Sequence, residues 1–592
     1  MTRRTIMTLV LASLGGLVAC QAIVGIEDTS LQGSGGKGDA SAGSGGSGGG
    51  SGGSGGLGDG SAGSGGAAGS GGSAGSGGAA GSGGALSDAG DASDGSLVND
   101  FGIQILTSQV QIGLGGKHFL PVELTRGPGF TAAVDVTLSA PPSGLTAQPL
   151  TIVAGETFGE LQLSAKSPLT VGSTFQLTIT GSSGTLSHDA SVNTFVTEKS
   201  GTLDKGFASN GIHLQSFGQH EVEIYDVHTA KDSRILFAGY QTGLSLAPMI
   251  GILATEGKKV DTQASIQPCS ACSPEGYARG IATMPSGPVL FATERYDDFI
   301  ISKHGSTNLG LDLTFGSSGP GYTRTDAGGT DKSLGVAALE APTGTRLFVF
   351  GTSNGNSAVA QLNALGTVQK TVTNLGMQGA THSSLAVTPN GRVYMVGNVT
   401  DGGGKIDMKL VALDANLALD TGFNGTGSVT YGASGVDDKA VTVLPQEDDK
   451  VLVAGSTNKS LWVRRYLPDG QLDPTFGTNG MASVAVNANS VTAADAVRFP
   501  DDRLVLLGNA VGGNNPGPAA VRLRRNGQAD PSWGDTGELG VVHLNLGQNA
   551  KIWAGDVQLS GTPALYRLVV GGTAENTAQF NVINGFVARA WY

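Results

Sequence analysis

The chain has few charged and few aromatic residues for its length. Of its 592 residues, 14% are charged and 6% are aromatic, and only 3 are cysteine. No run of 18 apolar residues occurs, so no segment is long enough to span a bilayer as a helix once a signal is removed. The net charge of -13 argues against nucleic acid as a partner, because phosphate contacts need a basic face.

The sequence patterns of common catalytic sites are also missing. No G-x-S-x-G elbow, P-loop or dinucleotide-binding fingerprint opens a helix. The 8 histidines are scattered, and the segment from His220 to Glu223, with His228 nearby, does not match the HExxH zinc pattern. We therefore expect surface polar residues there, and no catalytic residue, metal or cofactor in the chain.

Glycine is abundant instead, and it is concentrated near the N-terminus. The chain has 98 glycines, and residues 33–96 are roughly half glycine, with serine and alanine making up most of the rest. Units such as GSGGSA and GSGGAA recur there. Chains of this composition are flexible coils, and about 64 such residues span ~40–48 Å. We expect residues 20–97 to be a disordered tether.

The first twenty residues have the pattern of an export signal. Arg3 and Arg4 precede an apolar stretch from Ile6 to Val18, which is too short to span a membrane stably. The following Leu17-Val18-Ala19-Cys20 resembles the lipobox of bacterial lipoproteins. The resemblance implies a signal peptide at 1–19, removed before Cys20, and acyl chains on Cys20 that anchor the protein in a membrane. The same resemblance implies the outer membrane or cell surface, because Gln21 and not Asp follows Cys20.

The other two cysteines are close together in the chain. Cys269 and Cys272 lie in a loop rich in proline, and outside the cytoplasm such a pair is normally oxidised. We expect a disulfide that closes a short loop. A redox dithiol is the alternative, but the thioredoxin-type βαβ unit that it needs is not apparent.

Residues 98–197 alternate between apolar and polar residues in short runs. The runs cover 118–125, 133–139, 159–164, 174–180 and 188–196, and glycine and proline clusters separate them. About seven short strands in this length predict a small β-sandwich. The segment resembles the immunoglobulin-like modules of bacterial surface proteins, although it has no cysteine and no tryptophan. We expect it to be a spacer.

One motif, G-x-L-D-x-x-F-G-x-x-G, recurs through the rest of the chain. Clear copies centre on Asp204, Asp312, Asp420, Asp473 and Asp530. Their spacing fits a period of about 54 residues, with worn copies at Gly257 and Gly366 in the two long intervals. A β-run ending near glycine and a third run resembling "VARY" each recur seven times as well.

A period of this length with four short strands per unit is typical of a β-propeller. The motif resembles the bacterial delta-60 repeat family, which implies a propeller-like fold over 198–592 and no particular activity. The sequence therefore predicts an all-β chain: a β-sandwich followed by a seven-bladed propeller.

Two finer predictions concern the repeat. Asp473 is expected to cap a one-turn helix that starts at Pro474, with Phe476 filling the gap between neighbouring blades. The chain ends straight after a third strand, whereas 212–217 has no inner strands before it in its own unit. Pairing 212–217 with the terminal strand 586–591 would close the ring and leave no open sheet edge.

Polar residues follow the second strand of several units and would share one face of the propeller. The candidates for ligand binding are Asn398, Asp401, Asn458, Asn509, Asn514 and Asn576. Such residues are also common in turns, which is the competing interpretation. We expect a monomeric, non-catalytic binding or scaffolding module for glycan or envelope protein. The alternatives are a propeller-fold polysaccharide hydrolase or lyase and a purely structural surface protein.

Overall fold

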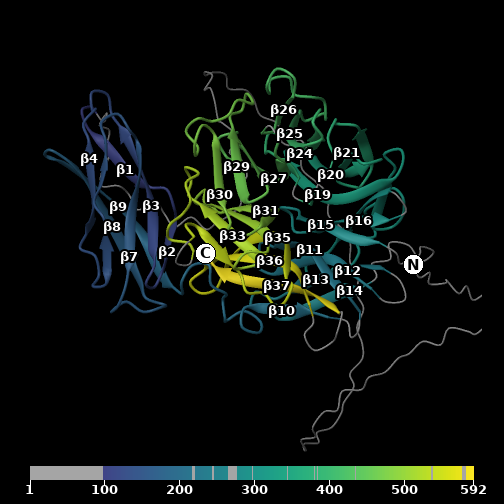
Figure 1. Ribbon diagram of the computed structural model, residues 1–592, viewed down its shortest axis with the longest axis horizontal. Coiled ribbons are helices and arrows are strands. Elements are labelled where there is room, and N and C mark those ends of the chain that lie inside the picture. Colours follow the sequence, from purple (N-terminus) through teal and green to yellow (C-terminus); the bar gives the residue numbers. More distant parts are fainter. Residues whose placement is uncertain are drawn as a thin grey trace, which may run out of the picture. The chain divides into compact units, whose positions relative to one another are not determined.

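The computed structural model describes residues 98–592 except 217–219, 243–245, 265–275, 296–297, 343, 379–380, 383, 434, 535–537 and 576–581. Strands joined by turns make up these residues, and no helix occurs among them (Figure 1). Accordingly, no membrane-spanning helix is found in the described part of the chain. The predicted signal peptide and tether, Cys20, Cys269, Cys272 and Asn576 lie outside the described residues.

Residues 98–197 form two sheets. The first has the strand order β1(Phe101–Ile105), β3(Lys117–Arg126), β7(Phe158–Ala165) and β5(Leu145–Ala147). The second has the order β2(Gln109–Gly113), β9(Leu186–Thr197), β8(Thr174–Ser183), β4(Val134–Ser139) and β6(Leu150–Ile152). Only β2 and β9 pair in parallel. Both sheets contribute to one apolar core, which includes Val122 from β3 and Ile179 from β8. All five runs predicted from their alternation are strands.

The described residues from 212 onward fold into antiparallel sheets of four strands, and six of these use consecutive strands. Their strands are β11(Val222–Thr229), β12(Ile235–Gln241), β13(Ala247–Leu253), β14(Lys259–Ala264); β15(Tyr277–Thr283), β16(Val289–Arg295), β17(Asp298–His304), β18(Tyr322–Thr325); β19(Asp331–Ala341), β20(Gly344–Ser353), β21(Asn356–Asn363), β22(Val368–Val372); β23(Leu385–Val387), β24(Val393–Thr400), β25(Ile406–Leu413), β26(Ser428–Tyr431); β27(Lys439–Pro445), β28(Val451–Ser456), β29(Ser460–Tyr466), β30(Met481–Ala485); and β31(Ser490–Arg498), β32(Leu504–Val511), β33(Gly517–Leu523), β34(Val541–His543). Such a series of four-stranded sheets is the architecture of a β-propeller.

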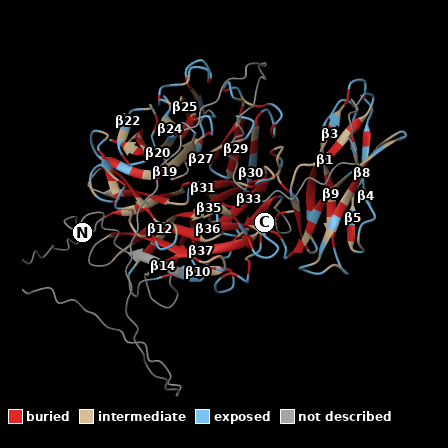
Figure 2. Ribbon diagram, turned by 180° about the vertical axis from the view of Figure 1, so that it is seen from behind, coloured by how far each residue is buried: buried red, intermediate tan, exposed pale blue. Residues whose placement is uncertain are grey.

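One further sheet joins the two ends of this region. Its order is β10(Ile212–Gln215), β37(Ile583–Trp591), β36(Leu565–Glu575) and β35(Lys551–Ser560). In the register, Ile212 lies opposite Ala588 and Gln215 opposite Gly585, so the predicted pairing of the early strand with the terminal strand is confirmed. The first strands of successive sheets contact one another, and β35 contacts β11, which closes the ring. Figure 2 shows how continuously β36 and β37 are buried.

The aspartate motif forms a turn between the third and fourth strands of a sheet. In the copy at Asp473, the carboxylate Oδ1 accepts hydrogen bonds from the Thr475 backbone nitrogen at 3.0 Å and from Thr475 Oγ1 at 2.6 Å. The expected capping by aspartate is present, but the expected one-turn helix is not. The chain leaves the turn at Gly477, whose φ of 56° directs it toward β30 before a helix can develop.

The aromatic residue of each motif joins neighbouring sheets, as predicted. The ring of Phe476 is buried and packs on Gly527, where an added Cβ would lie 2.9 Å from it. The next residue, Gly477, donates its backbone N–H to the carbonyl of Asn526 at 2.7 Å. Equivalent phenylalanine–glycine contacts join Phe207 to Gly257, Phe315 to Gly366, and Phe423 to Gly470. The degenerate copies of the motif at Gly257 and Gly366 therefore still contact a phenylalanine ring from a neighbouring copy.

Candidate functional site

Most of the first strands of the propeller sheets carry a β-bulge at the same place. A bulge leaves one residue unpaired and turns its side chain away from the regular alternation of the strand. The unpaired residues are Tyr225, Arg279, Leu334, Val441, Ala494 and Trp553. These equivalent positions hold very different side chains, in contrast to the recurring glycines and aspartates of the repeat.

A glycine on the second strand permits the close approach at these bulges. A Cβ on Gly239 would lie 1.8 Å from the carbonyl oxygen of Glu223, two residues before the bulged Tyr225. In the same way, a Cβ on Gly351 would lie 1.8 Å from the carbonyl oxygen of Lys332, and a Cβ on Gly572 would lie 1.9 Å from that of Lys551. The glycine that recurs at the end of the second run is thus the sequence signal for a bulge on the neighbouring strand.

Five of the six bulged residues surround one pocket of about 400 Å³. Its lining consists of Glu223, Tyr225, Arg279, Leu334, Thr381, His382, Thr492, Ala493, Ala494, Asn509 and Trp553. Most of these residues belong to the first strands of different sheets, and these strands follow one another around the ring. The pocket therefore lies where the bulges of the ring converge, and we refer to it as the axial pocket.

Aromatic side chains gather on one side of the axial pocket. The ring centroids of Tyr225 and Tyr240 are 5.7 Å apart in a stacked arrangement, and the Tyr240 and Tyr277 rings meet edge to face at 5.1 Å. Trp553 meets Tyr225 at 6.1 Å. The guanidinium of Arg279 lies 4.8 Å from the Tyr225 ring and 4.6 Å from the Tyr277 ring. Tyr240 is buried, whereas Tyr225, Tyr277 and Trp553 are half-buried. Half-buried aromatic faces beside a cation form a surface that suits a ligand with both apolar and polar faces.

Two glutamates supply negative charge at this cluster. Arg279 Nε donates to Glu294 Oε2 at 2.8 Å, which holds the guanidinium in place over the rings. Burial, together with the nearby charge of Glu223, raises the pKa of Tyr225 and of Tyr240 above the usual range. Both phenols therefore remain neutral hydrogen-bond donors. The indole Nε1 of Trp553 is buried and has no hydrogen-bond partner among the described residues.

A histidine at the edge of the axial pocket contacts carboxylates from two first strands. His382 Nε2 lies 3.3 Å from Asp495 Oδ2 and 3.9 Å from Asp226 Oδ1. Asp226 Oδ2 also accepts the backbone N–H of Ile281 at 2.7 Å, and Asp495 Oδ1 accepts the hydroxyl of Thr442 at 2.9 Å. The two aspartates thus link several sheets near the axis.

Burial and neighbouring charges shift the pKa values of Asp226 and His382. Burial raises the pKa of Asp226 to about 7, although the charge of His382 opposes this shift. Burial alone would lower the pKa of His382, but Asp226 and Asp495 together raise it to about 9. A histidine that keeps its proton at neutral pH is a poor general base, so the arrangement favours a structural link over base catalysis.

Three of the residues predicted to bind a ligand, here called the rim residues, bond backbone groups with their side chains. The Asn509 amide donates to the carbonyl of Ile552 at 2.8 Å and accepts its N–H at 2.9 Å, and Asn398 makes the same pair of bonds to Ala440 at 3.4 Å and 3.0 Å. Asp401 Oδ1 accepts the Gly403 and Lys405 backbone nitrogens and closes its own turn.

Asn458 and Asn514 are exposed. Asn514 lines a second pocket of about 910 Å³, which shares Glu223, Asn509 and Trp553 with the axial pocket. The structure thus brings Asn509 and Asn514 to one hollow and leaves Asn458 outside both pockets. Ligand binding by the predicted rim residues stays a prediction.

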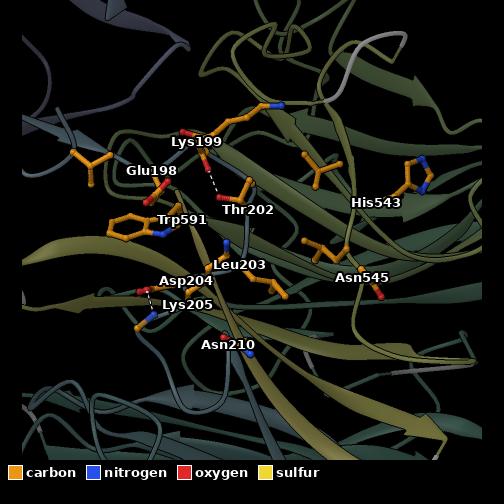
Figure 3. Close-up of a pocket in the computed structure, with 16 residues that line it drawn as sticks. Glu198, Lys199, Thr202, Leu203, Asp204, Lys205, Asn210, His543, Asn545 and Trp591 are labelled. Carbon is orange, nitrogen blue, oxygen red and sulfur yellow. Dashed lines mark hydrogen bonds between the residues drawn. The ribbon is translucent and has the colours of Figure 1, made fainter. Parts of the chain in front are cut away.

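A third pocket, of about 670 Å³, lies at the sheet in which β10 pairs with β37. Figure 3 shows Trp591 and Glu198 on one side of it and His543 and Asn545 on the other. Asp204, which also lines it, is buried and forms ion pairs with Arg567 at 3.1 Å and Arg589 at 2.9 Å. These contacts attach the first aspartate motif to the last two strands, so they serve closure of the ring.

The sequence did not indicate Tyr225, Arg279, His382 or Trp553 as site residues. None of them belongs to a recurring motif, and they are far apart in the chain. The glycine signal marks where a bulge occurs, but it does not reveal that several bulged side chains meet at one pocket. These side chains come together only when the sheets are arranged around the closed ring.

Comparison with known proteins gives a fold and no activity. The profile of a family described as "Domain of unknown function (DUF5122) beta-propeller" matches residues 446–476. No curated protein matches the chain in sequence. Together with the sheet topology, the family description identifies the repeated region as a β-propeller.

Three similar solved structures are distant. They are the AfRom2 CNH domain (9% identity, TM-score 0.36, covering 64% of this chain and 98% of that one), a subtype N10 neuraminidase-like protein of A/little yellow-shouldered bat/Guatemala/060/2010 (8%, 0.30, 53% and 94%), and a point mutant of the NanB sialidase from Streptococcus pneumoniae (8%, 0.33, 83% and 93%). Likeness at this level says nothing about substrate or activity.

Proposed function

We propose that the chain is a non-catalytic glycan-binding protein of the cell envelope, and that the glycan binds at the axial pocket. The observation that carries the proposal is the group formed by Tyr225, Arg279 and Trp553, which line that pocket. Tyr277 packs against Tyr225 and Arg279. Scaffolding of an envelope protein at the same surface is the nearest competing function.

The chemistry of these side chains suits a sugar. Flat aromatic faces pack against the C–H face of a pyranose ring, whereas Arg279 and Glu223 offer a donor and an acceptor to its hydroxyl groups. A concave site with aromatic walls and a few polar groups is the usual form of a ligand pocket.

The finer architecture is part of this proposal. We infer a seven-bladed propeller over 198–592 and a β-sandwich spacer over 98–197. Support comes from the seven recurrences of the second run, from the pairing of β10 with β37, and from the single core shared by the first two sheets. Lipid attachment at Cys20 and a flexible tether would hold this unit at the outer membrane or cell surface as a monomer.

A polysaccharide hydrolase or lyase is the second candidate function. The observation in its favour is the pairing of Asp226 with His382, because a buried carboxyl of pKa about 7 is suited to donating a proton near neutral pH. Against it, Asp226 Oδ2 is occupied by the backbone N–H of Ile281 and His382 holds its proton. Glycan binding at this pocket without catalysis is therefore the simpler conclusion.

Calorimetric titration of the purified chain with cell-envelope polysaccharides tests the proposal. We expect the variants Trp553→Ala and Arg279→Ala to weaken binding at least tenfold, since each removes a half-buried contact group. Arg346→Ala is the matched control, because its guanidinium contacts the carbonyl of Ala415 outside the pocket. Equal loss in all three variants, or no loss in the first two, would contradict binding there. Polysaccharide cleavage abolished by Asp226→Asn would favour the enzyme.

A further inference from the structure

Three carboxylates converge where one propeller sheet passes to the next. Asp298 begins β17, Asp331 begins β19, and Asp326 lies in the loop that joins the two sheets. One oxygen from each lies within 4.8 Å of the others. Asp298 and Asp331 are buried, with 3% and 0% of their surface exposed, whereas Asp326 is exposed. Oxygen ligands from carboxylates are those preferred by hard divalent cations.

An unsatisfied buried oxygen gives independent evidence for a ligand at this place. Asp331 Oδ2 accepts the backbone N–H of Ala327 at 2.6 Å, but Asp331 Oδ1 is buried and has no hydrogen-bond partner among the residues that the structure describes. The neighbouring Thr325 Oγ1 is likewise buried without a partner. Leaving a carboxylate oxygen buried and unpaired is costly, and buried charges are usually paired or coordinate a metal ion.

The local charge also fits a divalent ion. Arg324 forms an ion pair with Asp298 Oδ2, and its side chain is 54% exposed. One guanidinium against three carboxylates leaves a net charge of about two negative units, which a divalent cation would balance. We propose that Asp298, Asp326 and Asp331 form a calcium-binding site that fastens β17 to β19 across two sheets of the propeller.

The repeat itself contains a comparison site without a carboxylate at the loop position of Asp326. Phe299 pairs with Thr325 as Met408 pairs with Tyr431, so Asp407 corresponds to Asp298 and Gly432 to Asp326. Asp438 accepts the Ala433 N–H at 2.7 Å, as Asp331 accepts that of Ala327. With glycine at the position of Asp326, the acidic group corresponding to the loop ligand is missing. Calcium is therefore expected at the first site and not at the second.

Calcium titration of the full chain after chelator treatment tests the proposal. We expect one equivalent of Ca²⁺ to bind and to raise the thermal unfolding midpoint by about 2 °C or more, with a smaller effect of Mg²⁺. Asp326→Asn should abolish the response and still fold, since Asp326 is exposed, whereas Asp407→Asn should retain it. No binding at millimolar Ca²⁺, an equal response to Mg²⁺, or an unchanged response in Asp326→Asn would overturn the calcium site.

Discussion

The residues that repeat in this protein maintain the fold, and the residues that vary at equivalent places define its pocket. Gly239, Gly351 and Gly572 accommodate bulges on the neighbouring strands, and the glycine pattern was visible in the sequence. Tyr225 and Trp553 occupy equivalent bulged positions but belong to no pattern. They became recognisable as a site only when the structure placed their rings 6.1 Å apart.

The pH dependence of stability follows from His382. Its folded pKa of about 9 lies above the ordinary value of 6.5, so the folded state binds the extra proton more tightly. The stability from this group is fully present below pH 6.5 and is lost as pH rises through about 9. We expect the unfolding midpoint of the native chain to fall between pH 7 and 9.5.

His382→Gln is the matching variant for this pH series. Its midpoint should be lower than that of the native chain at pH 7, and its decline toward pH 9.5 should be weaker, because glutamine has no proton to lose. Parallel curves for the two proteins would show that His382 does not carry the effect.

At the scale of elements, the strands were more predictable than the motif between them. Period-two runs identified β3, β4, β7, β8 and β9, but β1, β2, β5 and β6 were missed because each is short, with 5 residues in β1 and β2 and 3 in β5 and β6. The one-turn helix expected at Pro474 is a turn. Hydrogen bonding of the Gly477 N–H to Asn526 draws the chain to the next sheet instead of continuing the helix.

The rim asparagines give a prediction at this scale. Asn509→Ala removes two hydrogen bonds to the backbone of Ile552 and should lower the free energy of unfolding by about 1–3 kcal/mol. Asn458→Ala, at an exposed position, should change it by less than about 0.5 kcal/mol. Chemical denaturation measures both. Equal, small effects would mean that the Asn509 amide contributes nothing to holding β32 against β35.

At the scale of the whole molecule, ring closure was predictable because two defects in the repeat complement each other. The last unit supplies β35, β36 and β37 to its sheet, and β10 begins without inner strands of its own. Sheet pairing removes both exposed edges at once. The meeting of bulged side chains at the axis was not predictable, since it depends on which sheets face each other around the ring.

The predicted lipid anchor gives a further prediction. Cys20→Ser should remove the lipidation site and move the protein from the membrane fraction to a soluble fraction, or leave its signal uncleaved. Cell fractionation with intact-mass analysis measures this directly. Unmodified Cys20 in membrane-bound protein would contradict lipid anchoring.

The most direct test of the central claim is hydroxyl-radical footprinting of the chain with and without bound envelope polysaccharide. Binding at the axial pocket predicts strong protection of Tyr225 and Trp553, and no change at Tyr322, which lies in β18 and does not line the pocket. Protection confined to other surfaces, with Tyr225 and Trp553 as reactive as in the free protein, would contradict the account.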